Sequence, residues 1–153
     1  MGSSPDRTLS EEVLMILVRE RLAAGYKVRY LPFQGVSMLP MLRQGKDRVE
    51  LGPLPERLKK HDLPVYQIPG GKYLMHRVHK VTPTHYICLG DNTLEYETIL
   101  PEQMIGIVTA FERNGKRIEA TNPWYRIYCR IWSHTRPIRR LYKWFREKTK
   151  KCK

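Results

Sequence analysis

The sequence predicts a mainly β domain of the α+β class, with one helix before it and a pair of helices after it. Between residues 27 and 120, short segments rich in β-branched and aromatic residues alternate with Gly and Pro, which is typical of strands joined by tight turns. The two flanking regions instead carry apolar residues at helical spacing. We therefore divide the chain into an N-terminal helix at 1–26, a β domain at 27–120 and a helical tail at 121–153.

The N-terminal helix is predicted from its start signal and its apolar stripe. Thr8-Leu9-Ser10-Glu11 has the form of a capping box, with Thr8 as the N-cap and Glu11 reaching back to it. From there a helix extends to about residue 24, and Gly25 is a suitable residue just past its end. The apolar stripe consists of Val13, Leu14, Leu17, Val18 and Leu22.

Seven strands are expected in the β domain. They are residues 27–34, 47–51, 64–68, 73–81, 85–89, 105–113 and 116–120, and residues 52–62 form a loop. Gly70-Gly71 and Thr82-Pro83-Thr84 are expected turns. Asn114-Gly115, between the last two strands, is the strongest short hairpin signal in the sequence.

The tail begins at Asn122-Pro123, with Asn122 as helix cap and Pro123 at the first helical position. Pro137 interrupts the helical pattern, and apolar positions continue beyond it. These positions are Trp124, Ile127, Tyr128, Ile131, Ile138, Leu141, Tyr142 and Phe145. Because Arg and Lys fill the remaining faces, we expect a basic amphipathic hairpin or pair of helices.

Charge separates the tail from the rest of the chain. Of the net charge of +13, residues 1–112 carry only +1, whereas residues 113–153 hold fourteen Lys and Arg against two acidic residues. Such a tail binds phosphate, on lipid or on nucleic acid. Three interpretations stay open: residues 122–153 pack on the β domain, bind an anionic membrane surface, or bind nucleic acid. A repressor-like DNA reader is disfavoured, because residues 1–25 supply only one helix.

Other features limit the classes of protein to which the chain can belong. No apolar run approaches the ~20 residues of a spanning helix, and the N-terminus lacks the pattern of a secretory signal. Cys88, Cys129 and Cys152 are far apart and form no CxxC pair, so we expect free thiols. His76 and His79 fall on opposite faces of a strand, so we expect no metal and no cofactor. The location we expect is cytoplasmic, either free or peripheral on the inner face of a membrane.

A candidate nucleophile lies in the segment Gly35-Val36-Ser37-Met38-Leu39-Pro40. Gly35 permits unusual backbone angles, and Pro40 restricts the residue before it. Ser37 is thereby held on a rigid turn after a strand, where its hydroxyl can meet a substrate. Gly35, Ser37, Met38 and Pro40 are the expected oxyanion and substrate-binding positions, with the Ser37 N–H as the oxyanion donor. Considered alone, this segment is more typical of an ordinary turn serine than of a nucleophile.

A candidate base and a carboxylate are provided by the next hairpin. If 82–84 form a three-residue loop, residue 81 pairs with residue 85, and His76 lies opposite Gly90 with Asp91 one step further. Neutral His76 can accept the Ser37 proton near pH 7, and Asp91 can hold the ring and stabilise the imidazolium. The expected substrate is an extended peptide lying beside an open strand. Structural roles for His76 and Asp91 are the alternative.

Four motifs in order resemble those of the signal peptidase I superfamily, which includes the LexA-type repressors. They are Gly35-x-Ser37-Met38-x-Pro40, His76-Arg77-Val78, Gly90-Asp91-Asn92 and Ile105-Gly106-x-Val108. The resemblance implies that Ser37 is the nucleophile and that the residue before Arg-Val is the base. That base is Lys in bacterial enzymes and repressors but His in the endoplasmic-reticulum type, so a Ser–His site is implied here. It also implies that Asp91 supports the site and that the β domain is a coiled, partly open barrel.

The leading hypothesis is therefore a serine endopeptidase of signal-peptidase type, using Ser37, His76 and Asp91. The alternatives are a non-catalytic module on the same fold that binds peptide or a membrane surface, and a regulator that contacts nucleic acid through its tail. A peptide or protein is the expected substrate in the first case.

Overall fold

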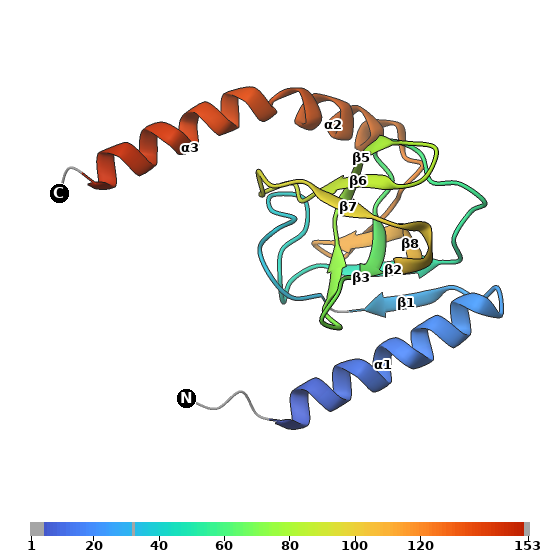
Figure 1. Cartoon of the computed structure of the whole chain (residues 1–153). Coiled ribbons are helices and arrows are strands. Elements are labelled where there is room, and N and C mark those ends of the chain that lie inside the picture. Colours follow the sequence, from blue (N-terminus) through green and yellow to red (C-terminus); the bar gives the residue numbers. More distant parts are fainter. Residues whose placement is uncertain (1–4, 32, 152–153) are drawn as a thin grey trace.

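The computed structural model describes residues 5–31 and 33–151, which form two antiparallel sheets with helices at both ends of the chain (Figure 1). The larger sheet contains β1 (Val28–Leu31), β2 (Arg48–Gly52), β3 (Pro64–Gln67), β4 (Tyr73–Met75), β8 (Met104–Arg113) and β9 (Lys116–Glu119). The smaller sheet contains β5 (Arg77–Val81), β6 (Tyr86–Leu89) and β7 (Glu97–Ile99). The helices are α1 (Pro5–Ala23), α2 (Pro123–His134) and α3 (Arg136–Lys151), and a short 3-10 helix spans Pro101–Gln103.

The strand order is β1-β2-β8-β3-β4 in the larger sheet, with β9 beside β8, and β5-β6-β7 in the smaller one. All described pairings are antiparallel, and the described strands do not close into a barrel. The predicted α+β class with a mainly β body is therefore confirmed. Long β8 connects β2 to β3 and so occupies the centre of the larger sheet.

Several local predictions are confirmed. Asn114 and Gly115 have φ values of 52° and 72° and join Arg113 to Lys116, as expected of a two-residue hairpin. The Asn122 side chain accepts hydrogen bonds from the N–H groups of the second and third helical residues, at 2.9 and 3.2 Å. The cap and the hairpin turn are recognisable in the sequence because each is made by local contacts alone.

Three local predictions are corrected. Helix α1 begins at Pro5, so Thr8 lies inside the helix and is not its N-cap. The single strand expected at 73–81 is divided at His76 into β4 and β5, which belong to different sheets. Strand β7 was not predicted, because its three residues are too few to show a period.

The core consists of two clusters. In the first, Val18 and Leu22 of α1 pack on the larger sheet. Its other buried members are Met38, Met41, Leu42, Val49, Leu51, Leu63, Val65, Ile105, Val108 and Phe111. The second lies between the two sheets and contains Leu58, Tyr66, Val78, Tyr86, Cys88, Ile99 and Met104. Cys88 and Cys129 are free and buried, as expected, and Cys152 lies outside the described residues.

The tail forms a pair of helices and not a hairpin. Helices α2 and α3 meet at Thr135 and follow one another without reversing direction, and α3 extends away from the sheets (Figure 1). Tyr125 of α2 packs against Phe111 of β8 with ring centroids 5.0 Å apart, and Cys129 is buried. Within the described ranges, no helix has both the length and the apolar character that crossing a bilayer requires.

A buried carboxylate joins four strands of the larger sheet. Glu50 on β2 accepts hydrogen bonds from Arg117 on β9 at 2.6 and 3.1 Å and from Thr109 on β8 at 2.8 Å. Lys27 and Arg29 also pair with it, at 3.4 and 2.9 Å. The hydrogen bonds from Arg117, followed by those from Thr109 and Lys27, outweigh the effect of burial and lower the pKa of Glu50 to about 2.

Glu50→Gln should make this sheet less stable and less sensitive to acid. Because the pKa of Glu50 is lower in the folded chain than its ordinary 4.5, its contribution is complete above pH 4.5 and is lost as the pH falls to about 2. The contribution is on the order of 3 kcal/mol. Urea unfolding of both proteins between pH 2 and 7 measures it, with exposed Glu56→Gln as the control. Parallel pH curves for Glu50→Gln and the unmodified chain would contradict this expectation.

Candidate active site

Ser37 lies on a turn between β1 and β2 that is held by its neighbours. Met38, Met41 and Leu42 are buried in the first core cluster and fix the turn from inside. Gly35 adopts φ +94°, and its N–H donates to the Gln44 side chain at 2.9 Å. The rigid turn expected from the sequence is present, although Met38 holds the turn from the core and does not face a substrate.

The Ser37 turn rests directly on the Gly90-Asp91-Asn92 turn. The Asn92 N–H donates to the Ser37 carbonyl at 2.7 Å, and the Asn92 side chain donates to the Val36 carbonyl at 3.1 Å. At Gly90 a Cβ would stand only 2.8 Å from the Ser37 carbonyl oxygen, so glycine is required for this approach. Two of the sequence motifs are therefore in direct backbone contact.

His76 lies where the chain passes from the larger sheet to the smaller one. Its ring is buried, and its Nδ1 lies 2.8 Å from Oε2 of Glu97. Since a carboxylate only accepts, Nδ1 carries the proton of this hydrogen bond. The Tyr66 hydroxyl donates to the same carboxylate. The other ring nitrogen, Nε2, is buried and has no hydrogen-bond partner among the described residues.

The strand register close to His76 agrees with the sequence prediction, but among the described residues Nε2 of His76 makes no hydrogen bond to the Ser37 hydroxyl. Arg77 pairs with Leu89, and continuing this register by one residue places His76 beside Gly90, the residue that contacts Ser37. The predicted register is therefore found at Arg77, the first paired residue after His76, although the hairpin closes differently. Val81 pairs with residue 86 and not 85, and an irregularity between residues 78 and 80 restores the expected pairing.

Asp91 does not contact His76 as the sequence hypothesis proposed. Its carboxylate accepts two hydrogen bonds from Arg77, from Nε at 2.8 Å and from Nη2 at 2.7 Å. The reason is the alternation of side chains along a strand. If His76 is opposite Gly90, the next residue, Asp91, points to the opposite face, where Arg77 also points. The proposed contact is therefore replaced by an Arg77–Asp91 pair on one face and a His76–Glu97 pair on the other.

Glu97 is the site residue that sequence reasoning missed. It pairs with Cys88 on β6, and Cys88 in turn pairs with Val78 on β5. Residues directly opposite one another share a face of the sheet, and His76, two residues before Val78, shares that face as well. The only sequence signal was the alternation of side chains, which places every second residue of a strand on the same face. It could be applied to Glu97 only if residues 97–99 were known to form a third strand.

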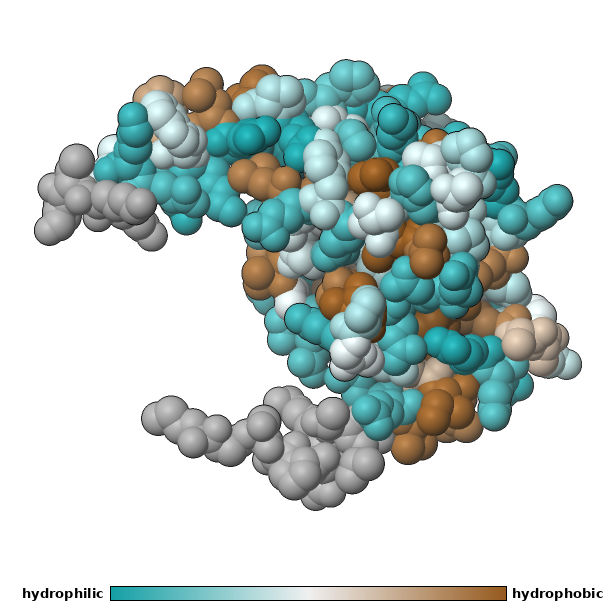
Figure 2. All heavy atoms as spheres, viewed as in Figure 1, coloured by the Kyte–Doolittle hydropathy of each residue, from teal (hydrophilic) through white to brown (hydrophobic). Residues whose placement is uncertain are grey.

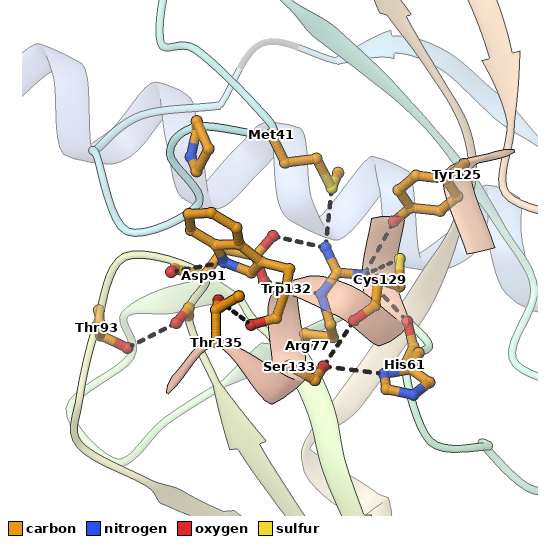
Figure 3. Close-up of polar contacts among 12 residues, drawn as sticks. Met41, His61, Arg77, Asp91, Thr93, Tyr125, Cys129, Trp132, Ser133 and Thr135 are labelled. Atoms are coloured by element: carbon orange, nitrogen blue, oxygen red, sulfur yellow. Dashed lines mark hydrogen bonds and ion pairs between the residues drawn. The ribbon is translucent and has the colours of Figure 1, made fainter. Parts of the chain in front are cut away.

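Arg77 is the centre of a buried polar cluster (Figure 3). Besides the pair with Asp91, its Nη1 donates to the His61 carbonyl at 3.2 Å and to the Tyr125 hydroxyl at 3.0 Å. Nη1 also contacts Cys129 Sγ at 3.0 Å, and Nη2 contacts Met41 Sδ at 2.9 Å. One guanidinium thus joins β5, the loop before β3, helix α2 and the segment that follows Ser37.

The tail helices hold the other side of the Asp91 turn. The Trp132 indole N–H donates to the Asp91 carbonyl at 3.0 Å, and Arg139 of α3 donates to the same oxygen. Arg136 donates to the Leu94 carbonyl at 3.0 Å. Helix α2 and the first turn of α3 are therefore part of the support of the site, in agreement with the interpretation that the tail packs on the β domain.

Burial sets the protonation of the groups around His76. Burial and the hydrogen bond to Glu97 raise the pKa of Tyr66, which therefore stays a donor to that carboxylate. Burial also raises the pKa of the Cys88 thiol to about 12, so this cysteine is not a thiolate near neutral pH. On the other face, burial opposes the charge of Arg77, but its hydrogen bonds to Asp91 raise its pKa well above the ordinary value.

Comparisons with known proteins do not assign this site. No protein-family model, no curated protein and no solved structure matches the chain. The resemblance to the signal peptidase I superfamily is therefore carried by the four short motifs alone. Within the described residues, no cluster of three or more His, Cys, Asp or Glu side chains is arranged to hold a metal ion.

Arg77→Met should strongly destabilise the chain, because it leaves the Asp91 carboxylate buried without its partner. A loss of about 3–5 kcal/mol in the free energy of unfolding is expected. The double variant Arg77→Met with Asp91→Leu removes both charges and should recover part of that loss. Urea unfolding of both single variants and the double variant gives the coupling between the two residues. Equal and additive losses would show that the pair does not act as a unit.

Proposed function

We propose that the chain is a serine endopeptidase of signal-peptidase type, with Ser37 as nucleophile, His76 as general base and acid, and Glu97 as the residue that positions His76. The observation that carries this proposal is the state of the imidazole. Its Nδ1 is occupied by a carboxylate, whereas Nε2 is buried and unpaired among the described residues. An unpaired buried polar atom lowers the free energy of unfolding by roughly 1–3 kcal/mol. We therefore attribute a functional role to Nε2.

The proposed reaction follows from the groups at hand. Oγ of Ser37 attacks the carbonyl carbon of a peptide bond while its proton passes to Nε2 of His76. Nδ1–H remains hydrogen-bonded to Glu97, which stabilises the imidazolium and fixes the ring. His76 then returns the proton to the leaving amine, and water repeats the sequence on the acyl-enzyme. The N–H of Ser37 is the proposed donor to the oxyanion.

The sheet topology supports an extended peptide as the substrate. Strands β1 and β4 end the strand order β1-β2-β8-β3-β4 of the larger sheet, and each comes shortly before one of the proposed catalytic residues. Ser37 follows β1, and His76 directly follows β4. An edge strand offers unpaired backbone groups to which an extended chain can bind. The proposal extends to the fold: the two sheets would correspond to the coiled, partly open barrel that the resemblance implies.

Ser37→Ala and His76→Ala should each abolish reaction while leaving the chain folded. A fluorophosphonate probe, which reacts with activated serines, should label the unmodified chain at Ser37 and neither variant, with rates at least about 10³-fold lower. Cleavage of a mixed peptide library, followed by mass spectrometry, should fail in the same two variants. Circular dichroism and urea unfolding verify the fold.

The matched control for this experiment is Ser133→Ala. Ser133 is also near a histidine, with its Oγ 3.3 Å from Nδ1 of His61, but it donates to the Cys129 carbonyl at 2.8 Å. Labelling should therefore continue in Ser133→Ala. Unchanged labelling or cleavage in Ser37→Ala, or no reaction of the folded unmodified chain with probe and peptides alike, would refute the proposed function.

Glu97→Gln should lower the activity strongly while changing the stability of the chain only slightly. The amide cannot hold the imidazolium as the carboxylate does, so the labelling rate of Ser37 should fall by about 10³-fold or more. The urea midpoint should change far less than in Asp91→Asn, because Asp91 supports the buried Arg77. Glu95→Gln, an exposed change two residues away, is the control. A Glu97→Gln variant that is labelled at the original rate would exclude Glu97 as the positioning residue.

A further inference from the structure

The tail carries an exposed apolar stripe that its packing on the β domain does not use. The stripe residues keep a helical spacing along both helices, and their side chains are 44–79% exposed. They are Trp124, Ile127, Ile131, Ile138, Leu141, Tyr142 and Phe145. Residues on the other side of α2, such as Tyr125 and Cys129, make the contacts with the β domain. We call this set the tail stripe.

The tail stripe is accompanied by a dense positive charge. Eight of the sixteen residues of α3 are Lys or Arg, and Glu147 is its single acidic residue. At 100° per residue, Arg139 and Arg146 lie beside the stripe on α3, and Lys143 lies on the side opposite it. We call α2 and α3 together the arm. Figure 2 shows hydrophobic residues gathered on the outer side of the arm, with hydrophilic residues beneath them.

The arm is both fixed at its base and free beyond it. Trp132, Arg136 and Arg139 bind the turn after β6 and the segment that follows, as described above. From residue 140 onward, every side chain that the structure describes is exposed, and α3 extends away from the sheets (Figure 1). The apolar residues of a helix in this position are not buried in the core of the chain. Their exposure therefore indicates that they bind another surface.

We propose that α2 and α3 form an interfacial anchor that binds an anionic lipid surface, with the tail stripe in the boundary between headgroups and acyl chains. An anionic bilayer is the partner that satisfies both properties, since it takes up apolar side chains and attracts Lys and Arg. Nucleic acid would use the cations but would leave the aliphatic residues in water. A second copy of the chain would cover the stripe but would bring two strongly basic helices together.

The arm also places this lipid surface close to the candidate site. Trp132 and Arg139 hold the Asp91 turn, and that turn contacts the backbone of Ser37. The inference itself rests on the exposure and charge of the arm and does not require the proposed peptidase activity. Ser37→Ala, which should lack activity, is expected to bind vesicles as the unmodified chain does, so the two proposals can fail separately.

The experiment is co-sedimentation of the full chain with vesicles of phosphatidylcholine alone or mixed with phosphatidylglycerol. Binding is expected only to the mixed vesicles and should weaken as salt is added. Lys143→Glu with Arg146→Glu should weaken it by about 20-fold or more, at roughly 1 kcal/mol per basic residue. Lys46→Glu with Lys72→Glu, an equal charge change at exposed turns of the body, should have a much smaller effect.

The apolar part of the proposal is tested in parallel. Ile138→Ser with Phe145→Ser should weaken vesicle binding by about 10-fold or more, because two large apolar side chains no longer enter the lipid. Ile16→Ser with Leu17→Ser, at comparably exposed positions of α1, is the matched control and should bind normally. Quenching of Trp fluorescence by brominated acyl chains should accompany binding, since exposed Trp124 belongs to the stripe.

Several results would overturn the proposal. These are equal binding to neutral and anionic vesicles, no binding to either by the folded chain, and binding that the stripe variant leaves unchanged. Tight salt-dependent binding to double-stranded DNA that is insensitive to the stripe variant would assign the arm to nucleic acid. Self-association that the stripe variant abolishes, measured by sedimentation velocity without vesicles, would assign it to a second copy.

Discussion

The buried pair of Arg77 and Asp91 is the interaction on which the arrangement of the candidate site depends. Both side chains are almost fully buried, at 4% and 3% exposure, so each charge needs the other. The planar guanidinium also meets acceptors from α2, the His61 loop and Met41, a geometry that lysine cannot provide. The pair therefore holds together three segments that are distant in sequence, among them the segment that follows Ser37.

The small sheet carries a different pair of polar side chains on each of its two faces. On one face, Arg77 and Asp91 bind the tail helices, whereas on the other, His76 and Glu97 meet Tyr66 from the larger sheet. Consecutive residues can serve such different roles because a strand turns successive side chains in opposite directions. His76 lies at the junction of the two sheets, and its side chain is buried there.

The tail has a packed side and an exposed side that composition alone did not separate. Its inner side is packed, with Tyr125, Cys129 and Trp132 covering the Arg77 cluster. Its outer side is left apolar and strongly basic along α3. A packed tail and the proposed membrane-binding tail are thus compatible, because the packed residues and the exposed apolar residues of α2 lie on different sides of the helix. The break at Thr135 lets α2 stay on the body while α3 leaves it.

The sequence by itself determined the features that depend on neighbouring residues. The β domain between helices, the Asn114-Gly115 hairpin, the Asn122 cap and the rigid turn at Ser37 follow from local sterics and hydrogen bonds. The pairing of Arg77 with Leu89 was also predicted, although an irregularity between residues 78 and 80 produces it and not the expected loop. Only the tertiary structure decided which carboxylate meets His76. Glu97 reaches it from a third strand too short to predict, and the alternation of side chains turns the nearer Asp91 to the opposite face.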